Sequence, residues 1–300
     1  KVMEYEDIGQ SREWEDIEYI NKGWSDDKKY KIKTRENEEL LLKISDIDQF
    51  AKKKKEFEII KDLEEKKILM PKAVDIGVCN NDQSIYSLYT WIKGEDAAEE
   101  ISKFSEEEQY KLGVNAGRYL KEIHSVNAPK SIEDWESRFN RKIDKKIENY
   151  KKCGVVLKDE KKILEYINKN RVLLKNRPQC LQHGDYHIGN MIITPERKLG
   201  IIDFNRYDYG DPWEEFNRIV WSAEVSPEFA SGYINGYFDD DVPELFFKLL
   251  LLYICSNEIS SVYWAQSFGE KEMNVMIKQV DNVMEWYDQC DSYIPKWYHK

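Results

Sequence analysis

Three side chains in the segment LQHGDYHIGNMIITPERKLGIIDFNR, residues 181–206, carry oxygen atoms of the kinds that assist phosphoryl transfer: Asp185, Asn190 and Asp203. A carboxylate such as Asp185 can accept the proton of an incoming hydroxyl group. The amide oxygen of Asn190 and the carboxylate of Asp203 are hard ligands that magnesium prefers, and they would leave coordination positions for triphosphate oxygens. These residue types therefore indicate phosphoryl transfer.

A β-hairpin would position the third of these side chains. Two short apolar runs, residues 191–193 and 199–202, are joined by a turn through Pro195. Such a pattern predicts two strands with a tight connection. The hairpin would deliver Asp203 to its end, beside Asp185 and the amide.

The histidines of the same segment suggest an alternative chemistry. His183, Asp185 and His187 alternate, so on an extended strand they would share a face and could bind the metal of a hydrolase. No further His or Cys lies nearby to complete such a site, and Asn190 and Asp203 would be left unexplained. We therefore expect the two histidines to bond the loop backbone and to hold Asp185.

The spacing of these residues resembles that of known kinases. Asp185 and Asn190 repeat the interval of the protein-kinase motif H-R-D-x-x-x-x-N, with Gly184 in place of the Arg, and the triplet DFN at 203–205 resembles D-F-G. The pattern H-G-D-x-H-x-x-N followed by I-I-D is similar to that of the aminoglycoside phosphotransferase and choline kinase group of small-molecule kinases.

This resemblance implies an α+β, protein-kinase-like fold with two lobes. Residues 1–93 would form a nucleotide-binding lobe with a five-stranded antiparallel sheet and one helix, and residues 94–300 a mainly helical lobe for catalysis and acceptor binding. The apolar patterns predict strands at 13–20, 30–34, 39–44, 73–79 and 84–92, and helices at 49–65 and 106–124.

An embedded lysine indicates the nucleotide site. Lys43 lies in the apolar run LLLKI at 40–44, where a buried ammonium group needs an anionic partner. By the resemblance, Lys43 would hold the α and β phosphates and Glu56 of the following helix would hold Lys43, with Glu58 as an alternative. We interpret the lysine run at 52–55 as a solvated helix face.

Two further segments would contact the nucleotide by resemblance. The loop at 21–29 contains Gly23 and Ser25 and is similar to the Gly-x-Ser nucleotide loop of the aminoglycoside phosphotransferases. The segment YTWIKG would form the hinge between lobes, where backbone groups near Thr90 and Ile92 would bond the adenine edge and Tyr89 would sit behind the ring.

The chain after the hairpin offers both structural and substrate-binding candidates. Asp211 precedes Pro212 and fits a helix N-cap, so we interpret it and Glu215 as structural. Arg206 is a catalytic candidate because its guanidinium group could meet the transferred phosphate. Acidic and aromatic residues that could line an acceptor pocket are Trp213, Trp221, Glu224, Glu258 and Trp264, of which we retain Glu224, Glu258 and Trp264 as substrate-site residues.

Composition restricts the partners. The formal net charge of −11 disfavours nucleic acid and suits a cationic small molecule. The five cysteines are scattered and indicate free thiols in the cytoplasm. The apolar run at 245–255 contains a lysine and is too short to span a bilayer, so we expect a buried helix rather than a membrane anchor. We also expect the protein to be a monomer.

We therefore expect a Mg²⁺-dependent phosphotransferase that uses ATP or GTP and an alcohol acceptor, most readily an aminoglycoside or related antibiotic. Enzymes of the same group resemble choline, homoserine, methylthioribose and macrolide kinases, so a metabolite or macrolide acceptor is an alternative. A catalytically inactive nucleotide-binding protein is disfavoured, because all five catalytic positions are present: Lys43, Glu56, Asp185, Asn190 and Asp203. A protein kinase would need an activation segment after Asp203, and none is present.

Overall fold

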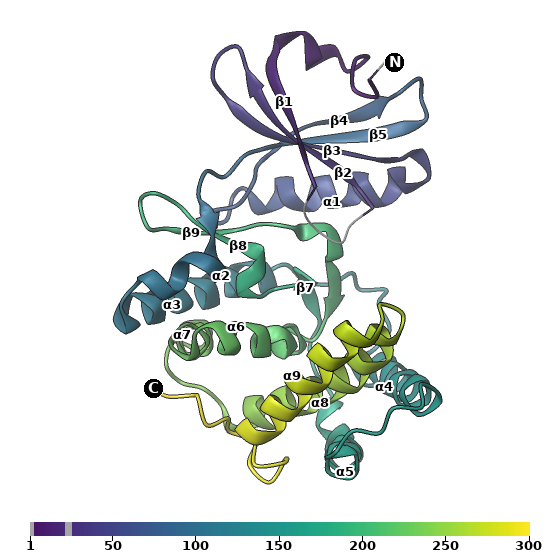
Figure 1. The fold of residues 1–300 in the computed structure, drawn as a ribbon, viewed down its shortest axis with the longest axis vertical. Coiled ribbons are helices and arrows are strands. Elements are labelled where there is room, and N and C mark those ends of the chain that lie inside the picture. Colours follow the sequence, from purple (N-terminus) through teal and green to yellow (C-terminus); the bar gives the residue numbers. More distant parts are fainter. Residues whose placement is uncertain (1–2, 22–25) are drawn as a thin grey trace. The chain divides into compact units, whose positions relative to one another are not determined.

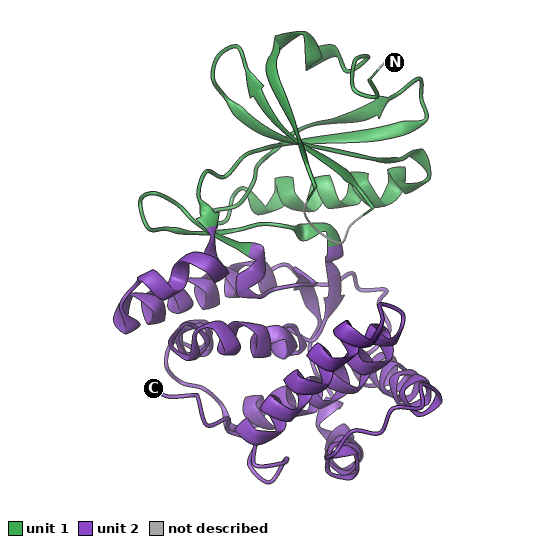
Figure 2. Cartoon of the chain, in the orientation of Figure 1, with its two compact units in different colours: residues 1–95, 191–205 green, residues 96–190, 206–300 purple. Residues whose placement is uncertain are grey.

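The computed structural model describes residues 3–21 and 26–300, which divide into two compact units. Unit 1 contains residues 1–95 and 191–205, and unit 2 contains residues 96–190 and 206–300 (Figure 2). The sequence indicated a boundary between residues 93 and 94. It did not indicate that the segment carrying Asp203 groups with the N-terminal part of the chain.

Unit 1 is built on the predicted five-stranded antiparallel sheet and its single helix (Figure 1). The strand order is β1-β2-β3-β5-β4, and α1 packs against β4 and β5. The elements are η1 (Gly9–Glu13), β1 (Trp14–Ile20), β2 (Lys28–Thr34), β3 (Glu39–Asp46), η2 (Ile47–Gln49), α1 (Phe50–Leu63), β4 (Ala73–Cys79), β5 (Ser84–Thr90), and the hairpin β8 (Met191–Ile193) and β9 (Leu199–Ile201).

The central strands of this sheet are buried on both faces, which explains their apolar sequences. All but the last residue of β5 are buried, and Leu42 on β3 and Leu88 on β5 are fully buried. Both belong to an apolar cluster with Ile32, Trp14 and Ile8. The pairing of β2 with β3 sets Lys29 directly opposite Lys43. Two lysines therefore face each other inside a mainly apolar sheet.

Unit 2 is mainly helical. Its long helices are α3 (Glu106–His124), α4 (Trp135–Lys152), α5 (Glu160–Asn170), α7 (Pro227–Phe238), α8 (Glu244–Gln266) and α9 (Glu270–Trp286). The shorter elements are α2 (Ala97–Glu100), η3 (Ile101–Lys103), η4 (Arg171–Leu174), β7 (Cys180–Gln182), η5 (Ile188–Asn190), β10 (Asp208–Gly210), η7 (Glu214–Arg218) and α6 (Ile219–Val225), while β6 (Glu95–Asp96) and η6 (Phe204–Arg206) straddle the division between units.

Helix α3 begins at a capping box and crosses α7 at very short range. Ser105 accepts a hydrogen bond from the N–H of Glu108, whose carboxylate accepts one from Ser105 N–H, so two N-terminal donors of the helix are satisfied. A Cβ atom at Gly117 of α3 would lie 2.3 Å from the carbonyl oxygen of Tyr233 on α7. Only glycine allows this backbone approach.

Helix α8 forms the centre of unit 2. It is the one helix of the described residues that is long and apolar enough to cross a membrane, and 72% of its most apolar window is buried inside the protein. It packs against α4, α5, α9 and η7. Its hydrophobic composition is therefore that of a core helix.

Candidate active site

The lysine and the glutamate predicted as a pair lie together in unit 1. Lys43 Nζ on β3 lies 3.4 Å from Glu56 Oε1 on α1, and the two side chains are 5% and 1% exposed. Burial would lower the pKa of Lys43, but the charges of Glu56, Asp203 and Asp27 raise it above its ordinary value, so the group stays an ammonium ion. The alternative partner, Glu58, is exposed.

Asp203 lies beside two lysines. Its Oδ1 atom is 3.3 Å from Lys29 Nζ and 3.8 Å from Lys43 Nζ. It follows β9 and has a φ of 65°, a left-handed conformation that aspartate adopts more readily than most residues other than glycine. Lys29 was not predicted as a site residue. Its pairing with Lys43 is a signal in retrospect, because two like charges opposite each other on neighbouring strands destabilise a sheet unless an anion lies between them.

The lysine run on α1 was interpreted incorrectly at one position. Lys53 was expected to be solvated with its neighbours, but its side chain is only 7% exposed. The reason is a tertiary ion pair, because Lys53 Nζ lies 2.5 Å from Asp27 Oδ2. Lys52 and Lys54 are exposed, as expected.

The predicted adenine-binding segment lies at the end of β5. Tyr89 is buried, and its ring lies 5.6 Å from Lys43 Nζ. The N–H of Thr90 donates to Lys72 O at 2.9 Å, so this donor is already used, whereas Ile92 N–H has no hydrogen-bond partner among residues 3–21 and 26–300. The predicted contacts of Gly23 and Ser25 fall outside the described residues.

In unit 2, Asp185 lies in a turn after β7, close to two arginines and a histidine. Its Oδ1 atom lies 3.0 Å from Arg218 Nε and 3.4 Å from His187 Nε2, and its Oδ2 atom lies 3.8 Å from Arg206 Nη1. The side chain is 17% exposed. Burial alone would raise the pKa of Asp185, but the His187 hydrogen bond and the charges of Arg218, His187 and Arg206 hold it well below the usual range. Asp185 is therefore a carboxylate at neutral pH.

Asn190 and the two histidines hold the same turn. The Asn190 amide Nδ2 donates to Asp185 O at 2.8 Å and lies 3.4 Å from His187 Nε2, which leaves the oxygen Oδ1 as the group that can face a cation. His183 is fully buried, and its Nδ1 accepts from Asp185 N at 3.2 Å. This inward-facing role of His183 disfavours the metallohydrolase interpretation.

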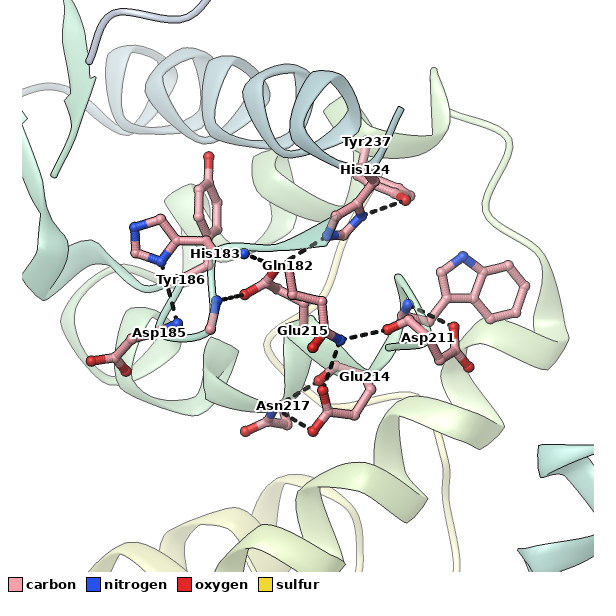
Figure 3. Close-up of polar contacts among 12 residues, drawn as sticks. His124, Gln182, His183, Asp185, Tyr186, Asp211, Glu214, Glu215, Asn217 and Tyr237 are labelled. Carbon is pink, nitrogen blue, oxygen red and sulfur yellow. Dashed lines mark hydrogen bonds and ion pairs between the residues drawn. The ribbon is translucent and has the colours of Figure 1, made fainter. Parts of the chain in front are cut away.

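A buried glutamate binds the backbone of the turn (Figure 3). Glu215 accepts hydrogen bonds from His183 N at 2.8 Å and from Gly184 N at 2.7 Å. His124 Nε2 lies 3.1 Å from the same carboxylate, and His124 Nδ1 lies 2.9 Å from Tyr237 Oη. Gly184 has a φ of 89°, and a Cβ atom there would lie 1.7 Å from Arg206 O. Glu215 thus fixes the backbone that carries Asp185.

Asp211 is buried and structural, and its side chain makes the bond expected of an N-cap. The following 3-10 helix, η7, starts at Glu214 rather than at Pro212. Asp211 accepts a hydrogen bond from Trp213 N at 2.9 Å, and it also accepts two from Arg177, at 2.7 and 2.9 Å, and one from Tyr253 Oη at 2.6 Å. The local bond of the predicted cap therefore forms, although the regular 3-10 helix begins only at Glu214 and distant partners use the same carboxylate.

The three predicted acceptor-site residues differ in exposure. Glu224 on α6 is exposed, and Trp264 on α8 is 42% exposed with its ring 4.3 Å from that of Phe268. Glu258 on α8 is fully buried, and neither carboxylate oxygen has a hydrogen-bond partner within the described part of the chain. Burial, and then the charge of Glu224, raise the pKa of Glu258 to about 8, so it is mainly a neutral acid at pH 7.

Sequence reasoning also missed Arg218, which makes the shortest contact of a cation with Asp185. Arg218 ends η7, three residues beyond Glu215, so one short helix supplies both the group that holds the turn and a group that contacts its carboxylate. No spacing rule known to us from the residues alone would have selected it.

Comparisons with known proteins agree with this geometry. The family model described as "Phosphotransferase enzyme family" matches residues 16–246. A search of curated proteins found no match. Among solved structures, the gentamicin complex of APH(2")-IIa has a TM-score of 0.66 at 24% identity, with 97% of each chain covered.

Two other solved structures show the same fold. ADP-bound APH(2'')-Ib has a TM-score of 0.62 at 23% identity and covers 97% of this chain and 98% of its own. Amicoumacin kinase hAmiN, in complex with AMP-PNP, Ca²⁺ and Ami, has a TM-score of 0.64 at 13% identity and covers 93% and 90%. At these identities the likeness establishes a kinase-like fold. Because the family model spans well over half of its length, this chain belongs to the phosphotransferase enzyme family.

Proposed function

We propose that this chain is a magnesium-dependent small-molecule kinase that transfers the γ-phosphate of ATP or GTP to a hydroxyl group of its acceptor. The observation that carries this proposal is the setting of Asp185. It is an ionised, mostly buried carboxylate on a turn whose backbone is bound by Glu215, and Arg218 and Arg206 lie beside it. Membership of the phosphotransferase family supports the same reaction class.

The residues of unit 1 would bind the nucleotide. Lys43, held by Glu56, would contact the α and β phosphates, and the backbone near Ile92 would contact the adenine edge. Asp203 and Asn190 fit magnesium ligands by their chemistry, since one offers a carboxylate and the other an amide oxygen that accepts no hydrogen bond from the residues that the structure describes. The ion would neutralise charge on the β and γ phosphates when bound.

Asp185 would orient the acceptor hydroxyl and accept its proton. Its lowered pKa keeps it ionised over the physiological range, so it can always accept a hydrogen bond from the hydroxyl. Phosphoryl transfer depends mainly on positioning and charge stabilisation, and a weakly basic carboxylate is therefore adequate. Arg206, which is half exposed, would meet the transferred phosphate, and Arg218 would hold Asp185 in place.

We propose a cationic acceptor, such as an aminoglycoside or related antibiotic, bound near Glu224, Glu258 and Trp264. The exposed carboxylate of Glu224 supports this, because it could meet an ammonium group directly, whereas Glu258 is fully buried and could act only through its electrostatic coupling to Glu224. The solved structures of similar fold include complexes with gentamicin and streptomycin. The net charge of −11 would also favour the approach of a polycation.

The test is a phosphorylation screen with the purified chain, Mg²⁺ and ATP or GTP. Aminoglycosides, macrolides, peptide antibiotics, choline, homoserine and sugars are offered as acceptors, and nucleoside diphosphate release is measured. We expect release to depend on a cationic hydroxyl compound and a phosphorylated product to be visible by mass spectrometry. Nucleotide binding without transfer to any acceptor, and without basal release, would instead indicate an inactive nucleotide-binding protein.

A further inference from the structure

A second buried ion pair lies next to the Lys43–Glu56 pair in unit 1. Lys53 on α1 and Asp27, which directly precedes β2, each expose only 7% of their side chains. Asp27 Oδ2 is 2.5 Å from Lys53 Nζ, and Asp27 Oδ1 accepts a hydrogen bond from Ser45 Oγ at 2.7 Å. Two charges removed from water in this way must each be satisfied, or the desolvation cost is large.

The two ion pairs share one carboxylate. Glu56 Oε1 lies 3.4 Å from Lys43 Nζ, while Glu56 Oε2 lies 3.7 Å from Lys53 Nζ. Oε2 is buried and makes no hydrogen bond within the described residues, so Lys53 is the cation that faces this oxygen. The result is a continuous line of alternating charges: Asp27, Lys53, Glu56, Lys43, Asp203.

The positions of these residues in the sequence explain how the line of charges holds helix α1 against strand β3. Lys53 and Glu56 are three residues apart on α1 and so lie on the same face of the helix. Ser45 lies two residues beyond Lys43 on β3, so the same strand that carries Lys43 also anchors Asp27. Asp27 therefore ties helix α1 to strand β3 at the level of the Lys43–Glu56 pair.

The neighbouring charges favour the ionised forms of both Asp27 and Lys43. Burial would raise the pKa of Asp27, but Lys53, Ser45 and Lys43 lower it below its ordinary value, so it is ionised. Asp27 in turn is one of the charges that favour the protonated form of Lys43. The Asp27–Lys53 pair thus acts on both members of the Lys43–Glu56 pair: Asp27 on Lys43, and Lys53 on Glu56.

We propose that Lys53 and Asp27 are positioning residues for the nucleotide: they fix Glu56 between two lysines and thereby hold the Lys43 ammonium group where the nucleotide's phosphates bind. This inference rests on the proposed nucleotide-binding role of Lys43. Neither residue needs to touch the nucleotide. Their loss would weaken recognition of the phosphates and leave recognition of the nucleoside unchanged.

The experiment compares binding of a nucleoside triphosphate with binding of its nucleoside, by calorimetry in the presence of Mg²⁺. The key variant is the double substitution Asp27→Asn, Lys53→Met, which removes both charges and so avoids an unpaired buried ion. We expect its melting temperature to stay near that of the wild type, its Kd for ATP or GTP to rise at least tenfold, and its Kd for the nucleoside to change less than twofold. Lys53→Arg, which keeps the charge, should bind the triphosphate within about threefold of wild type.

Lys54→Met on the exposed face of α1 is the matched control, and it should bind both ligands as the wild type does. Equal weakening of nucleoside and triphosphate binding in the double variant would indicate a merely structural role and overturn the inference. Unchanged triphosphate binding would overturn it as well. If the wild type itself bound no nucleotide, the proposed function would fail, which is a different result from failure of the double variant alone. Should the double variant not fold, Lys53→Arg with a tenfold loss of triphosphate affinity would equally contradict the inference, because it retains the cation.

Discussion

The buried carboxyl group of Glu258 predicts a pH-dependent stability that one conservative substitution should remove. Its pKa is about 8 in the folded protein, against an ordinary value of 4.5. Between these values the unfolded chain releases the proton while the folded protein keeps it, so stability falls as the pH rises from 4.5 to 8. Glu258→Gln replaces the neutral acid by a group of the same shape that never ionises.

The expected gain grows with pH. Each pKa unit is worth about 1.4 kcal/mol. Ionisation of Glu258 in the unfolded chain therefore lowers the free energy of unfolding of the wild type by about 3 kcal/mol at pH 7, and by less than about 1 kcal/mol at pH 5. Glu258→Gln should therefore match the wild type near pH 5 and exceed its free energy of unfolding by about 3 kcal/mol at pH 7.

The assay is urea denaturation followed by tryptophan fluorescence at pH 5, 6, 7 and 8. Glu285→Gln, on the exposed part of α9, is the control and should shift the stability equally at every pH. A Glu258→Gln variant that is less stable than the wild type, increasingly so at high pH, would refute the reasoning, because it would mean that Glu258 is ionised and paired in the folded protein.

Three further predictions follow from the contacts around the site. Glu215→Gln keeps the shape of the side chain but weakens its charge-assisted hydrogen bonds to the turn. Turnover should therefore fall about 10- to 100-fold, while nucleotide affinity, measured by calorimetry, should stay within about twofold of wild type. A loss of nucleotide affinity as large as the loss of turnover would contradict this. Asp203→Asn removes the carboxylate proposed to hold magnesium, so turnover in a coupled assay should drop about a thousandfold or more and nucleotide affinity should no longer respond to Mg²⁺; an unaltered Mg²⁺ response would refute that assignment. Gly117→Ala forces a methyl group against the α7 backbone, so it should destabilise the protein by about 1–3 kcal/mol in thermal unfolding. Gly9→Ala should be nearly neutral, because an added Cβ atom would meet no described residue within 4 Å beyond its chain neighbours; equal effects would show that the crossing of α3 and α7 is not tight.

The regular elements could be predicted from local pattern to within a few residues. The predicted helix at 106–124 and strand at 73–79 coincide with α3 and β4. Alternation of apolar residues, the Ser105 cap and the turn residues all act within a few positions of the chain, so sequence alone contains them. The local bond from Trp213 N to Asp211 was likewise predictable, whereas its other partners, Arg177 and Tyr253, are distant in sequence and were not.

The site shows the same division between local and distant information. Lys43 was noticed because a charge inside an apolar strand is conspicuous, and Asp185 and Asn190 because their spacing matches a motif. Lys53 was predicted to be solvent-exposed because the sequence does not distinguish it from the three other lysines at 52–55. Only its tertiary contact with Asp27 sets it apart. Arg218 likewise approaches Asp185 from a separate helix. Charge pairs that no motif marks, such as Lys53 with Asp27 and Arg218 with Asp185, therefore had to come from the structure.

The most direct test of the account is transfer of the γ-phosphate by wild type and Asp185→Asn, side by side, with the acceptor that the screen identifies. The product is measured by mass spectrometry, and nucleotide affinity by calorimetry. We predict that Asp185→Asn binds the nucleotide within about twofold of wild type and transfers phosphate about 100- to 10,000-fold more slowly. An Asp185→Asn variant that transfers phosphate as fast as the wild type would contradict the central claim that this carboxylate orients and deprotonates the acceptor hydroxyl.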